Sequence, residues 1–381
     1  MTHFSLLVTV VIITALAFDF TNGFHDTANA MATSIATGAL RPKVAVLISG
    51  ALNLAGAFLS TKVATTISSG IVNDRLTTPS IIFAGLVGAI LWNLATWLLG
   101  LPSSSSHALF GGLIGAVWVG AGINGVHFDQ VVSKILLPAA SSPIIAGIAA
   151  MIATYLAYRI TRRAQERPVT SGFRHGQTIS ASLVSLAHGT NDAQKTMGVI
   201  TLTLISTGAL AHGSAPPYWV IASAGLAIGL GTYFGGWRII RTMGNRLTDI
   251  TPPQGFAAET SSTAVILCSA NLGFALSTTH VVAGSVLGTG LGRRLAEVRW
   301  SVAGQMALAW LLTLPAAAAV GAVSAAVAVR GGTLGVVVIG LVALAVAVAS
   351  YAISRRQPVT ANNVNDTPQP HAQHAALSTA P

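Results

Sequence analysis

The chain has 381 residues, of which 52% are hydrophobic and only 8% are charged. An ordinary soluble domain carries about 25% charged residues, so this composition excludes a soluble globular protein. The net charge of +10 does not indicate nucleic-acid binding, because the basic residues form short clusters between apolar runs, a distribution typical of membrane topology. The single cysteine, Cys268, excludes an intrachain disulfide.

Long stretches without lysine or arginine predict the membrane spans. These stretches are 1–40, 76–133, 196–237, 247–292 and 300–329. One span needs ~20 apolar residues, so each stretch is long enough for one or two. We therefore expect an all-α polytopic membrane protein with about 10–12 transmembrane helices and half-helices, whose first helix is retained rather than cleaved as a signal peptide.

Clusters of basic residues predict which connections face the cytoplasm, where lysine and arginine are enriched. The clusters are Arg41/Lys43, Arg159-Arg162-Arg163-Arg167-Arg174, Arg238-Arg241-Arg246, Arg293-Arg294-Arg299 and Arg355-Arg356. The connections poor in lysine and arginine, which we expect on the outer side, are 70–79, 122–134, 211–217 and 330–332.

The same patterns divide the chain into segments. We expect a first membrane repeat at 1–160, a charged cytoplasmic linker at 161–177 and the core of a second membrane repeat at 178–300. The apolar stretch 301–356 predicts C-terminal transmembrane helices. Residues 357–381 contain too few large apolar side chains to pack, which indicates a disordered cytoplasmic tail.

A short motif occurs twice in apolar surroundings, at Gly23–Met31 and Gly189–Met197. Its glycine, aspartate and methionine recur at a constant offset of 166 residues (189−23 = 192−26 = 197−31). A polar, glycine-containing break that carries an aspartate and is made twice is typical of transporters built from internal repeats. The basic clusters send the two copies across the bilayer in opposite directions, so we expect two inverted-topology repeats.

Acidic residues inside the membrane are functional candidates, because an ionised carboxylate is costly there. Asp26, Asp192 and Glu259 lie within apolar segments, and Asp19 lies near the end of the first span, where an interfacial position is an alternative. Lys195 follows Asp192 at a spacing that allows a helical ion pair. The amides of two asparagines beside the aspartates, Asn29 and Asn191, suit a small cation or a phosphate oxygen.

A second duplicated element consists of hydroxyl residues followed by histidine. Ser104-Ser105-Ser106-His107 and Ser277-Thr278-Thr279-His280 are related by an offset of 173 (280−107). Hydroxyl residues at a helix start can cap it, and a helix start that faces a cavity is an anion site. The alternative is an ordinary hydroxyl bond to the backbone one turn back. For His107 and His280, a gating or structural hydrogen bond and a proton-handling role remain equally open.

These motifs together resemble the inorganic phosphate transporter (PiT) family. The resemblance includes Gly235-Gly236-Trp237-Arg238 leading to Pro253–Glu259, and it spans about residues 1–300. The sequences of the segments Asn22–Asp26 and Asn191–Lys195 are similar to those of the bacterial low-affinity branch. The family implies a multi-pass protein of the inner (cytoplasmic) membrane, with inverted repeats, alternating access and a homodimer. It implies phosphate near the midplane, held by Asp26, Asn29, Ser104, Ser105, Ser106, Asn191, Asp192, Ser277, Thr278 and Thr279.

The resemblance also bears on the cotransported ion. Many family members carry a glutamate in each half, whereas here Glu259 fills the second half and the first offers only Asn53. This departure favours protons over sodium, with the substrate carried as phosphate or as a neutral metal–phosphate complex. We expect no resident cofactor or metal. The candidate coupling residues are Asp26, Asp192, Glu259, His107, His280 and Lys195.

Other functions are less consistent with the sequence. A channel would not need titratable acids facing its anion. An intramembrane enzyme is disfavoured because the sequence contains no His-Glu-x-x-His or Gly-x-Ser-x-Gly motif. We therefore expect a secondary transporter that imports inorganic phosphate with a cation, rather than an enzyme. A sulfate permease of the same fold and a sodium-coupled phosphate symporter remain the alternatives.

Overall fold

The computed structural model describes residues 5–293 and 298–366, which form helices and no named strand. Within this part of the chain two isolated antiparallel bridges occur, Val72–Val126 and Thr248–Val298. The helices are α1 (Leu6–Ala36), α2 (Pro42–Gly56), α3 (Lys62–Thr66), η1 (Ile67–Ile71), α4 (Pro79–Leu99), α5 (Ser105–Ala121), η2 (Ile123–Gly125), α6 (Phe128–Val131), η3 (Val132–Leu136), α7 (Leu137–Thr161), α8 (Glu166–Ser206), α9 (Tyr218–Phe234), α10 (Trp237–Asn245), α11 (Pro252–Asn271), α12 (Thr278–Arg293) and α13 (Trp300–Ser354).

Four helical segments are long and apolar enough to cross a membrane: α1, α4, Phe128–Thr161 and α13. The bent pair α9 and α10 would add a fifth, and α2 and α5 are shorter apolar helices. The prediction of a helical membrane fold is confirmed, while the count of ten to twelve crossings stays a prediction. Helix α8 falls outside this group because it carries many polar side chains, of which most from Gln177 onward are buried against other helices.

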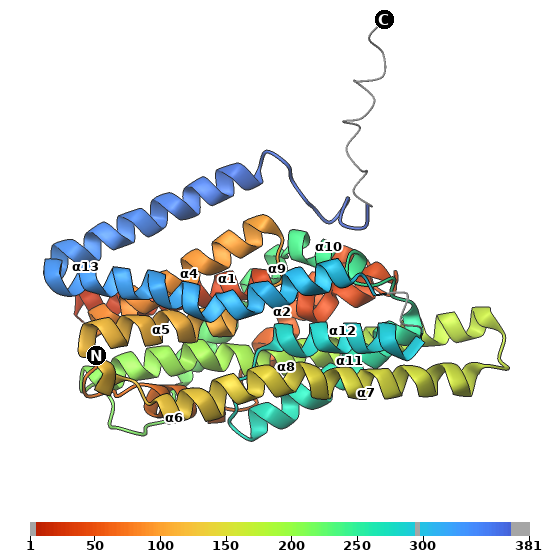
Figure 1. Ribbon diagram of the computed structural model, residues 1–381, viewed down its shortest axis with the longest axis horizontal. Coiled ribbons are helices and arrows are strands. Elements are labelled where there is room, and N and C mark those ends of the chain that lie inside the picture. The colour runs from red at the N-terminus through yellow and green to blue at the C-terminus, as the bar shows by residue number, and fades with distance from the viewer. Residues whose placement is uncertain (1–4, 294–297, 367–381) are drawn as a thin grey trace, which may run out of the picture.

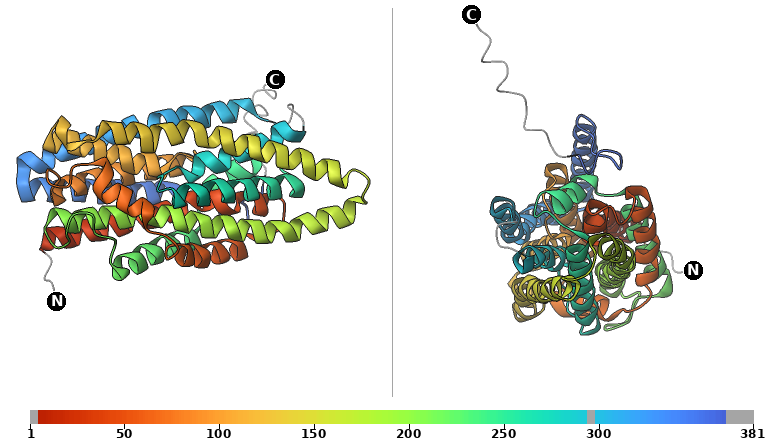
Figure 2. Two further views of the ribbon diagram at one scale, coloured as in Figure 1. Left: turned by 90° about the horizontal axis from the view of Figure 1, so that it is seen from below. Right: turned by 90° about the vertical axis from the view of Figure 1, so that its right-hand side faces the viewer.

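The two helices that carry the aspartate motifs lie together and run in opposite directions (Figure 2). Helix α1 packs against α8, α9, α4 and α10, and α8 packs against α11, α2 and α9 as well. Around them, each outer helix packs against helices of the other half of the chain: α7 covers α11 and α12, whereas α13 covers α4 and α5 (Figure 1). This reciprocal packing favours the inverted repeat, which stays a prediction.

The connections expected on the outer side meet at one end of the molecule. Val72 and Val126 form a bridge, and Asp74 pairs with His212 at 2.5 Å, so that three of these connections are joined. The opposite end carries the α7–α8 hairpin, with its arginines, and the ends of α12 and α13 that adjoin basic residues (Figure 1). The charge asymmetry of the sequence therefore corresponds to two distinct ends of the fold.

The expected glycine-containing break is wrong, because α1 and α8 run through both motifs as continuous helices. The motif glycines instead allow close helix packing. A Cβ at Gly23 would lie 2.3 Å from the carbonyl oxygen of Ile228 on α9, and one at Gly189 would lie 2.2 Å from that of Asn53 on α2. Small residues let helix backbones approach in membrane proteins, so each glycine fixes one helix contact.

The structure adds detail to two of the expected segments. The expected linker 161–177 is mostly helical, because α8 already begins at Glu166, and its role as a cytoplasmic linker stays a prediction. The first residues of the expected disordered tail pack against the body: Val364 is buried, and the carbonyl oxygen of Asn363 accepts a hydrogen bond from Arg241 on α10 at 2.5 Å. The remainder of that tail, 367–381, lies outside the described residues.

Labelling of single cysteines tests the assignment of the two ends. With Cys268 replaced by alanine, we expect cysteines at Ala211 and Asn124 to react with an impermeant maleimide added outside intact cells. Cysteines at Arg163 and Arg356 should react only after the membrane is permeabilised. All four positions are exposed, so accessibility alone does not separate them. Labelling of position 163 in intact cells would overturn the orientation.

Candidate functional site

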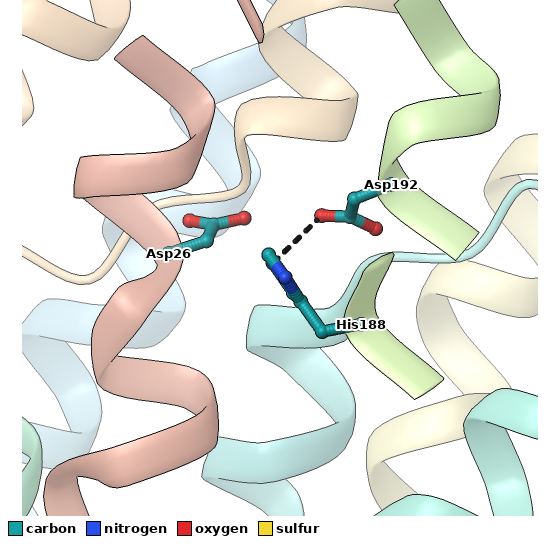
Figure 3. Close-up of side chains that lie close together, drawn as sticks. All are labelled: Asp26, His188 and Asp192. Carbon is teal, nitrogen blue, oxygen red and sulfur yellow. Dashed lines mark ion pairs between the residues drawn. The ribbon is translucent and has the colours of Figure 1, made fainter. Parts of the chain in front are cut away.

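Asp26 on α1 and Asp192 on α8 face each other at the centre of the protein (Figure 3). His188 lies between them, and one ligand atom from each of the three side chains falls within 4.8 Å of the others. The Nε2 atom of His188 is 3.2 Å from Asp192 Oδ2. Sequence reasoning missed His188, although it precedes Asp192 by four residues and so shares its helix face.

The two hydroxyl-rich runs begin α5 and α12, as the sequence predicts. The Oγ atom of Ser104 accepts a hydrogen bond from the backbone amide of His107 at 3.1 Å, and Ser277 Oγ accepts one from the amide of His280 at 3.3 Å. Both runs are thus helix caps. The remaining hydroxyls extend from the capped ends toward the aspartates.

Each aspartate receives a hydroxyl from one of these runs. Ser105 Oγ donates to Asp26 Oδ2 at 2.5 Å, and Thr278 Oγ1 donates to Asp192 Oδ2 at 3.2 Å. The offsets of the sequence convert one contact into the other, since 26 + 166 = 192 and 105 + 173 = 278. The structure therefore builds the same contact twice, once in each half of the chain.

A second pair of contacts is related in the same way but differs in charge. Lys195 Nζ pairs with Asp192 Oδ1 and donates to Ser106 Oγ at 2.5 Å. Asn29 Nδ2 donates to Thr279 Oγ1 at 2.9 Å. Because 195 − 166 = 29 and 106 + 173 = 279, an ammonium group in one half takes the place of an amide in the other. The site is therefore asymmetric in charge although similar in shape.

The residues before the aspartates are also equivalent in position and different in chemistry. Asn191 Nδ2 donates to Asp192 Oδ1 at 2.7 Å and to the carbonyl oxygen of Leu276 at 3.2 Å. His25 occupies the matching position in the first motif, with Nδ1 at 2.7 Å from Asp26 Oδ1. Both carboxylates are thus held by a neighbour on their own helix.

The two histidines that end the hydroxyl runs pack against each other. The rings of His107 and His280 have centroids 4.8 Å apart, and His280 also lies against Trp310. His280 Nδ1–H donates to the carbonyl oxygen of Ala139 at 3.2 Å. Within the described chain neither ring forms a hydrogen bond with Asp26 or Asp192, which favours the structural alternative for this pair.

Glu259 is not part of this central cluster. It lies on α11, and its carboxylate accepts hydrogen bonds at 2.6 Å from both Thr33 and Ser34 of α1. Gln177 and Ser180 of α8 also donate to it. Glu259 is therefore a buried carboxylate with well-matched donors at a second position along α1.

The expected first-half counterpart of Glu259, Asn53, is wrong. Helix α4 begins at Pro79 and α11 at Pro252, an offset of 173 residues. At this offset, residue 86 in the first half is equivalent to residue 259 in the second. That residue is Leu86, a fully buried apolar side chain. Asn53 lies on α2 instead, where its Oδ1 accepts from His188 Nδ1 at 2.9 Å, so it orients a histidine of the central site.

The whole set of site side chains is closed off from both ends. Each candidate residue is at most 5% exposed, and both aspartates are at most 1% exposed. A substrate can reach this position only if helices move apart on one side or the other. The structure therefore shows the site in a form that solvent does not reach.

Comparisons with known proteins agree with this geometry. Residues 22–321 match the model of the phosphate transporter family. The chain is 57% identical over 365 residues to the probable low-affinity inorganic phosphate transporter of Mycobacterium bovis, covering 94% of this chain and 87% of the relative. It is 41% identical to the protein of the same description from Bacillus subtilis, covering 84% of this chain and 96% of the relative.

A solved structure supports the fold independently. The structure described as the sodium-dependent phosphate transporter superposes with a TM-score of 0.75 at 24% identity, covering 84% of this chain and 98% of its own. The relatives are transporters, which excludes the enzyme alternative. With its duplicated aspartates, hydroxyl-capped helices and a match over most of its length, the chain belongs to the phosphate transporter family.

Proposed function

We propose that this protein imports inorganic phosphate across the cytoplasmic membrane by alternating access, together with a cation that is a proton. The observation that carries the proposal is the meeting of two capped helix starts with two buried aspartates. The helix starts supply hydrogen-bond donors for an anion, and the aspartates supply negative charge for a cation. The closed position of the site supports a carrier rather than a continuous pore.

The starts of α5 and α12 are suited to bind the phosphate oxygens. The first backbone amides of a helix have no partner within it, and the helix dipole adds positive potential there. Ser105 and Thr278 add hydroxyl donors that currently contact the aspartates. A hydroxyl can rotate from a carboxylate to a phosphate oxygen, so the same groups serve the empty and the loaded site.

Charge explains why a cation must accompany the anion. Two aspartates and one lysine leave a net negative charge before phosphate arrives, and two like charges 4 Å apart repel by about 4 kcal/mol at an effective dielectric constant of 20. A phosphate anion near both carboxylates is repelled by each of them. The cluster of Asp26, His188 and Asp192 is the position where an added cation would remove it.

Several features favour protons as the driving cation. The first half has Leu86 where the second has Glu259, so a matched pair of glutamates that would help to coordinate sodium is absent from these positions. His188 places an imidazole, a group that can accept and donate a proton, beside both aspartates. The sodium-dependent protein of similar fold shares 24% identity with this chain, a likeness that concerns the fold and leaves the coupling ion open.

We propose phosphate rather than sulfate as the substrate, because relatives 41% to 57% identical are described as phosphate transporters. Transport of a neutral metal–phosphate complex would satisfy the same charge requirement as protons. Many apolar side chains are exposed on the outer helices, a surface that suits lipid contact and leaves room for a homodimer.

Substitution of the aspartates tests the duplicated site. We expect Asp26→Asn and Asp192→Asn each to reduce phosphate uptake to background, because each carboxylate compensates a cation that the anion needs. Uptake of labelled phosphate would be measured in proteoliposomes with equal amounts of inserted protein. Asp129→Asn, which changes an exposed aspartate, is the matched control. Near-normal concentrative uptake by either buried variant would refute the essential role.

Ion gradients imposed separately test the coupling. At fixed external pH, accumulation by the wild-type protein should disappear when a protonophore is added and should not change when potassium replaces sodium. Holding the pH constant keeps the protonation state of phosphate itself unchanged. Uptake that requires sodium and ignores the protonophore would contradict proton coupling, and competition by sulfate as strong as by phosphate would contradict the substrate.

A further inference from the structure

Asp19 on α1 is a buried carboxylate that the mechanism above does not use. It is 0% exposed, and neither of its oxygens has a hydrogen-bond partner among the described residues. By contrast, Asp26, Asp192 and Glu259 all accept hydrogen bonds from neighbouring side chains. An ionised carboxylate in such surroundings costs several kcal/mol, so the charge of Asp19 requires a cation.

Two further oxygens near Asp19 are also unsatisfied. Thr196 Oγ1 and Asn22 Oδ1 are buried, and neither has a hydrogen-bond partner in the described part of the chain. Both side chains interact with the Asp19 carboxylate, although without hydrogen bonds of normal geometry. The Asp19 carboxylate, Asn22 Oδ1 and Thr196 Oγ1 are thus buried oxygens without a hydrogen bond, and oxygen atoms are the donors that hard cations prefer.

The position of Asp19 along α1 gives it a place in a path. Asp19, Asp26 and Thr33 are spaced seven residues apart, which is about two helical turns and ~10.5 Å each, so they lie on nearly the same helix face. Asp26 belongs to the central site, and Thr33 donates to Glu259. One face of α1 therefore passes three buried carboxylates in succession. With the orientation assigned above, Asp19 is the outermost.

The charges of the central site act on Asp19. Asp192 repels its carboxylate and Lys195 attracts it, and both lie on α8. These are the charged side chains that face Asp19 from the helices packed around it. A cation on Asp19 therefore changes the potential at the phosphate site. The second half offers no equivalent acid, since the matching residue at an offset of 166 is Ser185.

We propose that Asp19, together with Asn22 and Thr196, binds the cotransported cation on the outer side of the phosphate site. The inference rests on the cation symport proposed above and adds the residue at which the cation first binds. The ligand is the proton of the proposed symport, bound to the carboxylate, and a sodium ion held by the surrounding oxygens is the alternative that the test distinguishes. The cation binds and leaves reversibly, and no other bond forms or breaks.

The test separates coupling from phosphate handling. In proteoliposomes, Asp19→Asn should retain exchange of external labelled phosphate for internal unlabelled phosphate, since the central site is intact. It should lose accumulation driven by an imposed cation gradient, because asparagine cannot hold the charge that pairs with the cation. Asp19→Glu should restore part of this accumulation, and Asp129→Asn should behave like the wild type in both assays.

The two cation sources are distinguished by running the gradient with a protonophore and with potassium in place of sodium. The cation that drives the wild type must be the one whose effect Asp19→Asn removes. Full accumulation by Asp19→Asn would refute the inference and leave the symport intact. Loss of both exchange and accumulation in Asp19→Asn, with no rescue by Asp19→Glu, would also refute it, since Asp19 would then be structural. A wild-type protein that no cation gradient drives would refute the proposed symport itself.

Discussion

The structure depends on the compensation of two carboxylates that are removed from water. Asp26 and Asp192 lie at the centre of the helix bundle with at most 1% exposure, where an uncompensated charge is strongly unfavourable. Hydroxyls from the starts of α5 and α12, together with Lys195 and His188, supply this compensation. It suffices for the empty site but not for a site that also holds an anion. We propose that phosphate is coupled to a cation because of this local charge.

The rest of the fold brings these groups together. Helices α1 and α8 run in opposite directions, and their motif glycines let neighbouring helices approach closely. Helices α5 and α12 can begin in the interior because their caps satisfy the first amides and because protein, not lipid, surrounds them. The outer helices α7 and α13 then cover α12 and α5. The polar side chains of the site are thus buried among helices.

Much of the site could be predicted from the sequence, because a repeat fixes equivalent positions in space. The offsets 166 and 173 predicted that the aspartates and the hydroxyl runs belong together, and capping is a local rule that needs no tertiary information. His188 could not be found in this way, since a single histidine on a helix gives no sign of its neighbours. Asp19 was left between an interfacial and a functional position for the same reason: burial is a property of the packed helices.

The errors also have physical causes. The motif glycines indicated a break, but their role depends on carbonyl groups of α9 and α2 that lie far away in the sequence. Asn53 was matched to Glu259 because both are polar, without knowledge of where the helices begin, and this match is wrong. The prolines that begin α4 and α11 give the correct register and lead to Leu86. Local signals therefore located the site, whereas its asymmetry became visible only in three dimensions.

The most direct test of this account is a count of the positive charge taken up when phosphate binds. Calorimetry of the purified wild-type protein, in buffers with different ionisation heats and with or without sodium, gives the protons bound per phosphate and the sodium dependence of its Kd. Comparison with Asp192→Asn cancels the protons that phosphate itself exchanges. The account predicts that the wild type takes up more positive charge per phosphate than the variant. Equal uptake by both proteins, with a Kd that does not depend on sodium, would contradict it.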